Sequence, residues 1–129
     1  MVGDMADSEP NFLGLFSGEA NPVRLQAGDV LFRKGDAARS MYVVLSGEVR
    51  VGDEGPVVQK LAAGSIVGEM GLIDHAPRSA TVTALTPTTL AEVDEKRFLF
   101  MVRETPAFSL NVLRLLTHRL RRTLALAGA

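Results

Sequence analysis

The chain has 129 residues, of which 47% are hydrophobic, and a formal net charge of −1. This length suits one domain with one core, and no apolar run approaches the roughly 18 residues of a membrane-spanning helix. The absence of cysteine excludes disulfides, thiolate metal sites and cysteine nucleophiles, and it is compatible with a reducing, cytoplasmic location. The first twenty residues carry four acids and no base, which is unlike a secretion signal.

The N-terminal region divides into two parts. Residues 1–10 are acidic and without periodicity, which predicts a disordered lead-in before one folded domain over 11–129. The next stretch, "NFLGLFSG", predicts a short helix that docks through Phe12, Leu13, Leu15 and Phe16.

The region from Val23 to Val93 consists of short β-rich runs broken by Gly, Asp and Pro. Turn sequences such as "AGD", "KGD" and "SGE" separate these runs, because Gly tolerates positive φ and Asp bonds its own backbone. Many short, closely spaced strands indicate a mostly β fold of the sandwich, barrel or roll type. The predicted strands are "PVRLQ", "VLFRK", "MYVVLSG", "EVRVGD", "VVQKL", "SIVG", "SATVTAL" and "TLAEV".

The end of the chain has helical periodicity. Asp94 is a plausible N-cap of a first helix, and this helix is expected to end at Thr105 and Pro106. A second helix is expected over 107–127. Its apolar residues form two rows, so one row can cover the β domain while the other meets a second copy, unless the helix simply packs more deeply than usual. One row consists of Leu113, Leu116, Leu120 and Leu124, and the other consists of Phe108, Val112 and Leu115.

The stretch "GEMGLIDHAPRSATV", residues 68–82, places charges in an apolar setting. "GEMGLID" suits one or two helical turns whose free N-terminal amides attract phosphate, and Gly68 allows close backbone approach. Arg78 offers a fork that matches two phosphate oxygens, and Glu69 can accept hydrogen bonds from sugar hydroxyls. The pattern therefore indicates a nucleotide monophosphate site. The alternative is that Glu69 and Arg78 pair with each other.

The same stretch closely resembles the phosphate-binding cassette of the cyclic-nucleotide-binding domain family, and the resemblance extends over about residues 12–127. The flanking "AGDVLFRKGDAARSMYVVLSGEVRV" resembles the early strands of the family. The resemblance implies a β-roll (a double-stranded, jelly-roll-like β-helix) with a short N-terminal helix, a cassette helix and two C-terminal helices. It also implies that Glu69 holds the ribose 2′-hydroxyl and Arg78 the exocyclic phosphate oxygens. Further phosphate contacts are expected from the backbone around Gly68, Met70, Ser79 and Ala80.

Base recognition is expected from the last helix. The resemblance to the activator branch of the family places the Thr123 hydroxyl on an adenine, which favours cyclic AMP (cAMP) over cyclic GMP (cGMP), although a plain helix-surface Thr is the alternative. Ser79 is ambiguous, because its hydroxyl suits either the phosphate or a syn guanine. Arg121 and Arg122 are candidates for a base lid. Four arginines in this helix, at 114, 119, 121 and 122, otherwise indicate a solvated face.

These inferences predict a cyclic nucleotide sensor that transmits binding through its C-terminal helices to an unidentified effector protein, with a homodimer through 107–127. The chain ends without residues for a helix-turn-helix, so no direct DNA binding is expected. A ligand-free dimerisation or scaffold module, or the regulatory fragment of a larger transcription factor or signalling protein, remains the alternative. His75 and His118 are too few for a metal site, and no catalytic arrangement is found, so no enzyme is predicted.

Overall fold

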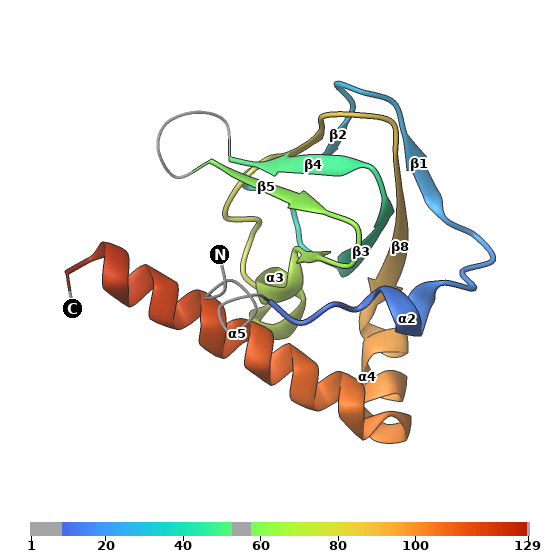
Figure 1. Cartoon of the computed structure of the whole chain (residues 1–129), viewed down its shortest axis with the longest axis vertical. Coiled ribbons are helices and arrows are strands. Elements are labelled where there is room, and N and C mark those ends of the chain that lie inside the picture. The colour runs from blue at the N-terminus through green and yellow to red at the C-terminus, as the bar shows by residue number, and fades with distance from the viewer. Residues whose placement is uncertain (1–8, 53–57, 129) are drawn as a thin grey trace, which may run out of the picture.

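The computed structural model describes residues 9–52 and 58–128. All eight predicted strands are present, and every pair of neighbouring strands is antiparallel (Figure 1). They form two four-stranded sheets, one in the order β1-β8-β3-β6 and the other in the order β2-β7-β4-β5, which together make the predicted roll. The strands are β1 (Val23–Leu25), β2 (Val30–Phe32), β3 (Ser40–Ser46), β4 (Glu48–Val51), β5 (Gln59–Ala62), β6 (Ile66–Val67), β7 (Val82–Ala84) and β8 (Thr88–Asp94).

The strand β7 is shorter than the "SATVTAL" segment predicts, because the residues before it bond to a turn instead of a ladder. The amide of Arg78 donates to the Asp36 carbonyl and the amide of Gly35 donates to the Arg78 carbonyl. The Thr81 hydroxyl then accepts a hydrogen bond from the amide of Lys34 at 3.0 Å. These bonds fix the end of the cassette against the turn that follows β2.

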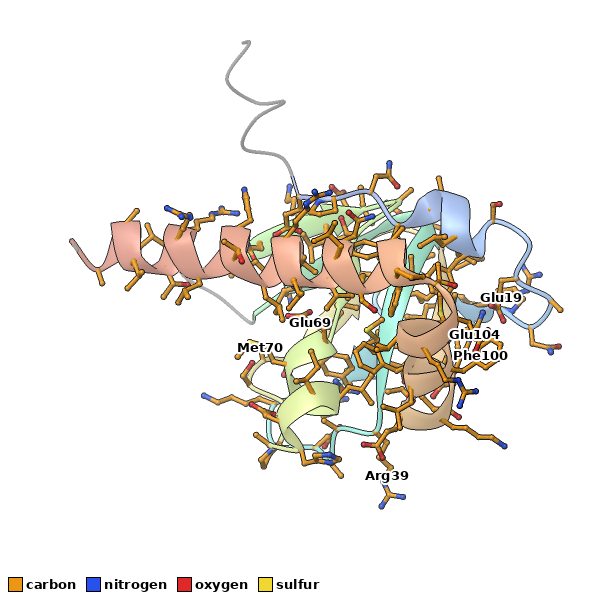
Figure 2. The ribbon with its side chains drawn as sticks, turned by 90° about the horizontal axis from the view of Figure 1, so that it is seen from below. Glu19, Arg39, Glu69, Met70, Phe100 and Glu104 are labelled. Atoms are coloured by element: carbon orange, nitrogen blue, oxygen red, sulfur yellow. The ribbon has the colours of Figure 1, made fainter. Side chains whose placement is uncertain are left out.

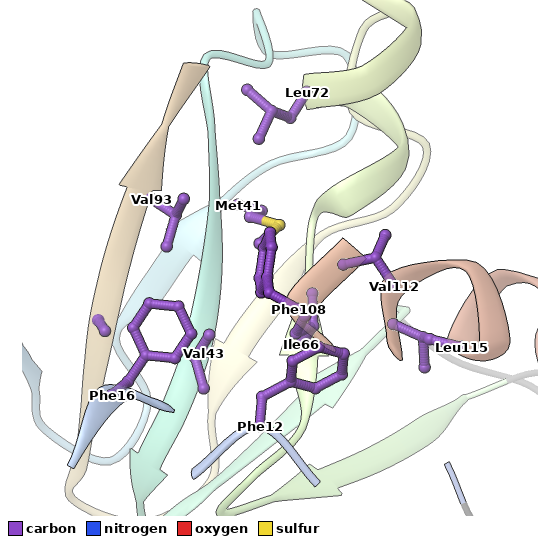
Figure 3. Close-up of a cluster of buried hydrophobic side chains, with 11 residues drawn as sticks. Phe12, Phe16, Met41, Val43, Ile66, Leu72, Val93, Phe108, Val112 and Leu115 are labelled. Atoms are coloured by element: carbon purple, nitrogen blue, oxygen red, sulfur yellow. The ribbon is translucent and has the colours of Figure 1, made fainter. Parts of the chain in front are cut away.

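Strand β3 reads as a continuous apolar run because both of its faces are buried. Met41 and Val43 face a core shared with the helices, whereas Val44 faces a second core between the sheets. Figure 3 shows the first core. Its fully buried residues are Phe12, Phe16, Met41, Val43, Ile66, Leu72, Ala91, Val93, Phe108, Val112 and Leu115.

The helices of the described residues that cover this first core are α2 (Leu13–Phe16), α3 (Glu69–Asp74), α4 (Glu95–Glu104) and α5 (Pro106–Leu126). The predicted N-cap is confirmed, since the Asp94 carboxylate accepts from the amide of Arg97 at 2.8 Å. The helix α4 ends before Pro106, and Pro106 is the first residue of α5. Its missing N–H is harmless there, because an N–H at the start of a helix has no partner within the helix. Phe108 contacts the rings of Phe12 and Phe16 edge-on, which ties α5 to the docked N-terminal helix.

The two rows of α5 have different surroundings, as predicted. Phe108, Val112 and Leu115 are buried against the roll. Of the other row, Leu116 packs against the core, whereas Leu113, Leu120 and Leu124 are 61%, 59% and 47% exposed. Beyond the roll, the C-terminal part of α5 extends on its own (Figure 1). Within the described residues, no helix is both long and apolar enough to cross a membrane.

The predicted lead-in over 1–10 needs one correction. Residues 1–8 lie outside the described residues, but Glu9 and Pro10 are half-buried beside the helices. The Glu9 carboxylate accepts two hydrogen bonds from Arg119, at 2.7 and 2.9 Å, so this part of the chain belongs to the folded domain.

Candidate functional site

The cassette begins at Gly68, which is the N-cap of α3 and adopts a left-handed conformation with φ of 80°. A Cβ atom at this position would lie 2.5 Å from Nη1 of Arg78, so both the backbone angle and the close approach require glycine. A Cβ at Gly71 would similarly lie 2.3 Å from the Cβ of Ala38. The two glycines therefore let the six-residue helix α3 lie against Arg78 and the loop before β3.

Arg78 is a buried cation with neutral hydrogen-bond partners. Its side chain is 6% exposed, and its Nη1 and Nη2 donate to the carbonyls of Gly68 at 2.9 Å and Ser40 at 2.5 Å. The guanidinium lies over the ring of Phe32, with Cζ 3.9 Å from the ring centroid. Its Nε is buried, and no described residue accepts a hydrogen bond from it.

The charge of Arg78 is thus only partly compensated. Burial lowers the pKa of its guanidinium, and electrostatic interactions with Tyr42, Glu69 and Asp36 offset this only in part. Among the ion pairs between described residues, none includes Arg78. A buried guanidinium with a free donor favours an added anion, because hydrogen bonds between ions are stronger than those to carbonyls.

Glu69 pairs with Arg119 of α5, and not with Arg78. Its carboxylate is in the first turn of α3 and 4% exposed, and its Oε1 accepts from Nη1 of Arg119 at 2.7 Å. Figure 2 shows Glu69 beside α5. The alternative in which Glu69 and Arg78 satisfy each other is therefore wrong for this structure, and Glu69, the predicted sugar acceptor, is bonded to the last helix.

Arg119 is the residue that the sequence interpretation missed. It donates to Glu9, to Glu69 and to the Ile66 carbonyl, so it belongs to a buried network and not to a solvated face. Burial by itself lowers the pKa of the Arg119 guanidinium, but hydrogen bonds and charges from Glu9 and Glu69 outweigh it and raise the pKa. The signal was present in the sequence, because Arg119 continues the helical spacing of Phe108, Val112 and Leu115.

The other predicted phosphate contacts lie around the cassette. Met70 is 57% exposed, so its side chain is turned outward and only its backbone belongs to the start of α3. Ser79 is exposed and Ala80 half-buried, both between Arg78 and β7. Within the described part of the chain, the amides of Ser79 and Ala80 have no hydrogen-bond partner. Their position suits an anion held by Arg78.

The structure does not bring the predicted base contacts to Arg78. Thr123, Arg121 and Arg122 are exposed on the far part of α5, and the Thr123 hydroxyl donates to the Arg119 carbonyl at 3.0 Å. Arg122 lines a cleft of about 480 Å³ beside the edge strand β5, together with His118. No group of three metal-ligating His, Cys, Asp or Glu side chains occurs among the described residues.

Comparison with known proteins agrees with this geometry. The chain is 26% identical over 120 residues to the "CRP-like cAMP-activated global transcriptional regulator" of Mycobacterium tuberculosis, covering 89% of this chain and 54% of that protein. It is 33% identical over 104 residues to the lysophospholipase nte1 of Aspergillus fumigatus, covering 77% of this chain and 7% of that protein. The chain thus spans about half of the first relative and a small part of the second.

Solved structures show the same fold. The catabolite activator protein of Thermus thermophilus superposes with a TM-score of 0.75 at 28% identity, covering 88% of this chain and 61% of that one. The cAMP-bound form of the EAL enzyme Bd1971 gives a TM-score of 0.59 at 31% identity, covering 81% of this chain and 30% of that one. Residues 22–105 match the sequence model described as the cyclic nucleotide-binding domain. The chain belongs to the cyclic nucleotide-binding domain family.

Proposed function

We propose that this domain binds a cyclic nucleotide at the cassette, with Arg78 as the phosphate ligand. The observation that carries the proposal is the state of Arg78, which is buried, donates to two backbone carbonyls, and has a buried Nε for which no described residue supplies an acceptor. A cyclic phosphate would supply the missing anion. The amides near Gly68 and Met70 and those of Ser79 and Ala80 add neutral donors around the same position.

Glu69 is proposed as the acceptor for the ribose 2′-hydroxyl. Arg119 occupies one of its carboxylate oxygens, and an ionised carboxylate has further lone pairs to accept a hydroxyl. Glu69 lies one residue from Gly68, whose carbonyl accepts from Arg78. A ligand that carries a phosphate and a neighbouring hydroxyl fits this pair of opposite charges.

Cyclic AMP is the proposed ligand in preference to cyclic GMP. The Mycobacterium relative is named as cAMP-activated, and the Thermus thermophilus "Cyclic AMP receptor protein" is 33% identical over 99 residues. Thr123 lies one helical turn beyond Arg119, which contacts the proposed sugar acceptor. We assign the Thr123 hydroxyl to the adenine. Arg121 and Arg122 are proposed as a base lid. Since Bd1971 has been solved with cAMP and with cGMP, the preference needs a direct comparison.

Calorimetric titration of the chain with cAMP and with cGMP tests this function. We expect saturable 1:1 binding of cAMP, with cGMP binding more weakly. No heat with either nucleotide at high micromolar concentration would exclude the receptor function. The chain would then be better described as a scaffold of the same fold, a candidate that the exposed leucine row of α5 favours.

The contact between Glu69 and Arg119 provides a route for transmission. Because the proposed sugar acceptor is bonded to α5, a ligand at Glu69 acts on the position of that helix. Hydrogen exchange of residues 106–126 should therefore slow when cAMP is added. Unchanged protection of α5, with binding verified in the same sample, would contradict this route.

The exposed row of α5 is the proposed interface with a second copy or with an effector protein. Leu113, Leu120 and Leu124 leave an apolar strip on the surface of one helix. Leu120→Lys should reduce self-association in sedimentation experiments and change cAMP affinity less than about twofold, since it lies outside the cassette. An unaltered oligomeric state would remove Leu120 from the interface. Within a longer protein, this domain would act as a ligand-binding regulator and not as a catalytic unit.

A further inference from the structure

Glu9 and Glu69 bind the same guanidinium in different ways. Arg119 donates through Nε and Nη2 to both oxygens of Glu9, at 2.7 and 2.9 Å. To Glu69 it donates through Nη1 alone, at 2.7 Å, and to one oxygen only. All three side chains are largely buried, with 15%, 6% and 21% exposure for Glu9, Glu69 and Arg119.

This unequal sharing matters for the cassette. A guanidinium prefers to bind a carboxylate with two parallel hydrogen bonds, and that arrangement occupies both carboxylate oxygens. If Arg119 bound Glu69 in this way, each oxygen would already accept one N–H, and neither would keep all of its lone pairs for a hydroxyl. Glu9 takes the two-bond arrangement instead, and a further bond from Nη2 to the Ile66 carbonyl, at 2.9 Å, holds the guanidinium in this orientation.

We propose that Glu9 is a positioning residue for the nucleotide site: it keeps Arg119 from occupying both oxygens of Glu69, so that one oxygen remains for the ribose 2′-hydroxyl. Glu9 itself does not touch the ligand. This inference rests on the proposed function, and it adds a residue from outside the matched range of 22–105 to the ligand-binding network.

Glu9→Gln tests the proposal, with cAMP and 2′-deoxy-cAMP as the two probes. A hydrogen bond from a hydroxyl to a charged group is worth about a factor of ten or more in affinity, so wild-type chain should prefer cAMP by about that factor. In Glu9→Gln, a neutral amide with one acceptor oxygen replaces the carboxylate, which weakens the hold on Arg119 and lets it turn to bind both oxygens of Glu69. The preference should then fall to about threefold or less, mainly through weaker binding of cAMP.

Glu19→Gln is the matched control. Glu19 also belongs to the N-terminal part of the chain and also pairs with an arginine of the C-terminal helices, Arg97, at 2.8 Å, but among the described residues no hydrogen bond or ion pair joins it to the cassette. It should lower thermal stability to a similar degree as Glu9→Gln and keep the full preference for cAMP. The ratio of the two affinities separates positioning from stability, because a general loss of structure would weaken both probes together.

The outcomes are distinct. If wild-type chain binds neither probe, the proposed function fails. If the wild-type chain prefers cAMP and Glu9→Gln keeps that preference, the positioning role of Glu9 is wrong while the function stands. If Glu19→Gln loses the preference as well, the effect belongs to the N-terminal segment as a whole, and the assignment to Glu9 is overturned.

Discussion

Arg78 is buried and Arg119 is partly buried, and these two arginines are held in opposite ways. Arg119 of α5 has two carboxylates and one carbonyl as partners, so its charge is more than compensated within the domain. Arg78 of the cassette has two carbonyls and an aromatic ring as partners, and its Nε finds no acceptor among the residues that the structure describes. The first arginine is neutralised by partners within the domain, and the second is the one for which we propose an anionic ligand.

A cation that stabilises the fold differs from a cation that binds a ligand in where its partner of opposite charge comes from. Burying a charge costs free energy that a partner of opposite sign has to offset. Where the partner is part of the chain, removing the cation should destabilise the protein. Where the partner is a ligand, removing the cation should abolish binding and leave the fold intact.

Replacing Arg119 should have the largest effect. Arg119→Leu leaves Glu9 and Glu69 buried without their cation, which should lower the free energy of unfolding by about 3 kcal/mol. Urea denaturation measures this loss. The double variant Arg119→Leu with Glu9→Gln should recover part of it, because one uncompensated charge is gone. A single variant as stable as the wild-type chain would contradict the structural role.

Replacing Arg78 should affect binding instead. Arg78→Leu removes the proposed phosphate partner, and losing one side of a buried charged pair should weaken cAMP binding by about 100-fold or more. Stability should stay the same or rise, because an incompletely paired cation is no longer buried. Titration and thermal unfolding of the same variant provide both values. Unchanged affinity would end the assignment of Arg78.

A smaller effect is expected from the glycine that makes room for Arg78. Gly68→Ala introduces a Cβ 2.5 Å from Nη1 of Arg78 at a backbone φ of 80°, so it should cost about 1 kcal/mol of stability and also weaken cAMP binding. Gly28→Ala is the control, because its φ is 92° but a Cβ there would have no neighbour within 4 Å. Both variants carry the backbone strain, and only Gly68→Ala should change affinity. Equal affinities would show that the contact with Arg78 is unimportant.

The sequence predicted most of this architecture for identifiable reasons. Alternating and continuous apolar runs mark the strands, Asp94 and Pro106 mark the ends of the C-terminal helices, and the glycines mark the turns. The order of residues from Gly68 to Val82 is specific enough to identify the cassette. These features are local, so they can be recognised without knowing how distant segments pack.

The partners of the charged residues could not be predicted in this way. Glu69 and Arg119 are separated by 50 positions, and Glu9 and Arg119 by 110, so only the folded chain shows that they meet. The sequence offered Arg78 as the nearest partner for Glu69, and the fold selected Arg119. The rotation of α5 about its own axis decides which arginine meets Glu69, because it turns Arg119 toward the roll and leaves Arg121 and Arg122 exposed.

The most direct test of the central claim is the NMR signal of the Arg78 Nε–H during a titration with cAMP, assigned by its absence in Arg78→Leu. Within the described part of the chain, this donor is buried and has no acceptor. The account predicts a saturable downfield shift that follows ligand occupancy, as a phosphate oxygen becomes its acceptor. If backbone signals report binding while the Arg78 Nε–H stays in place, the cassette does not hold the phosphate as proposed.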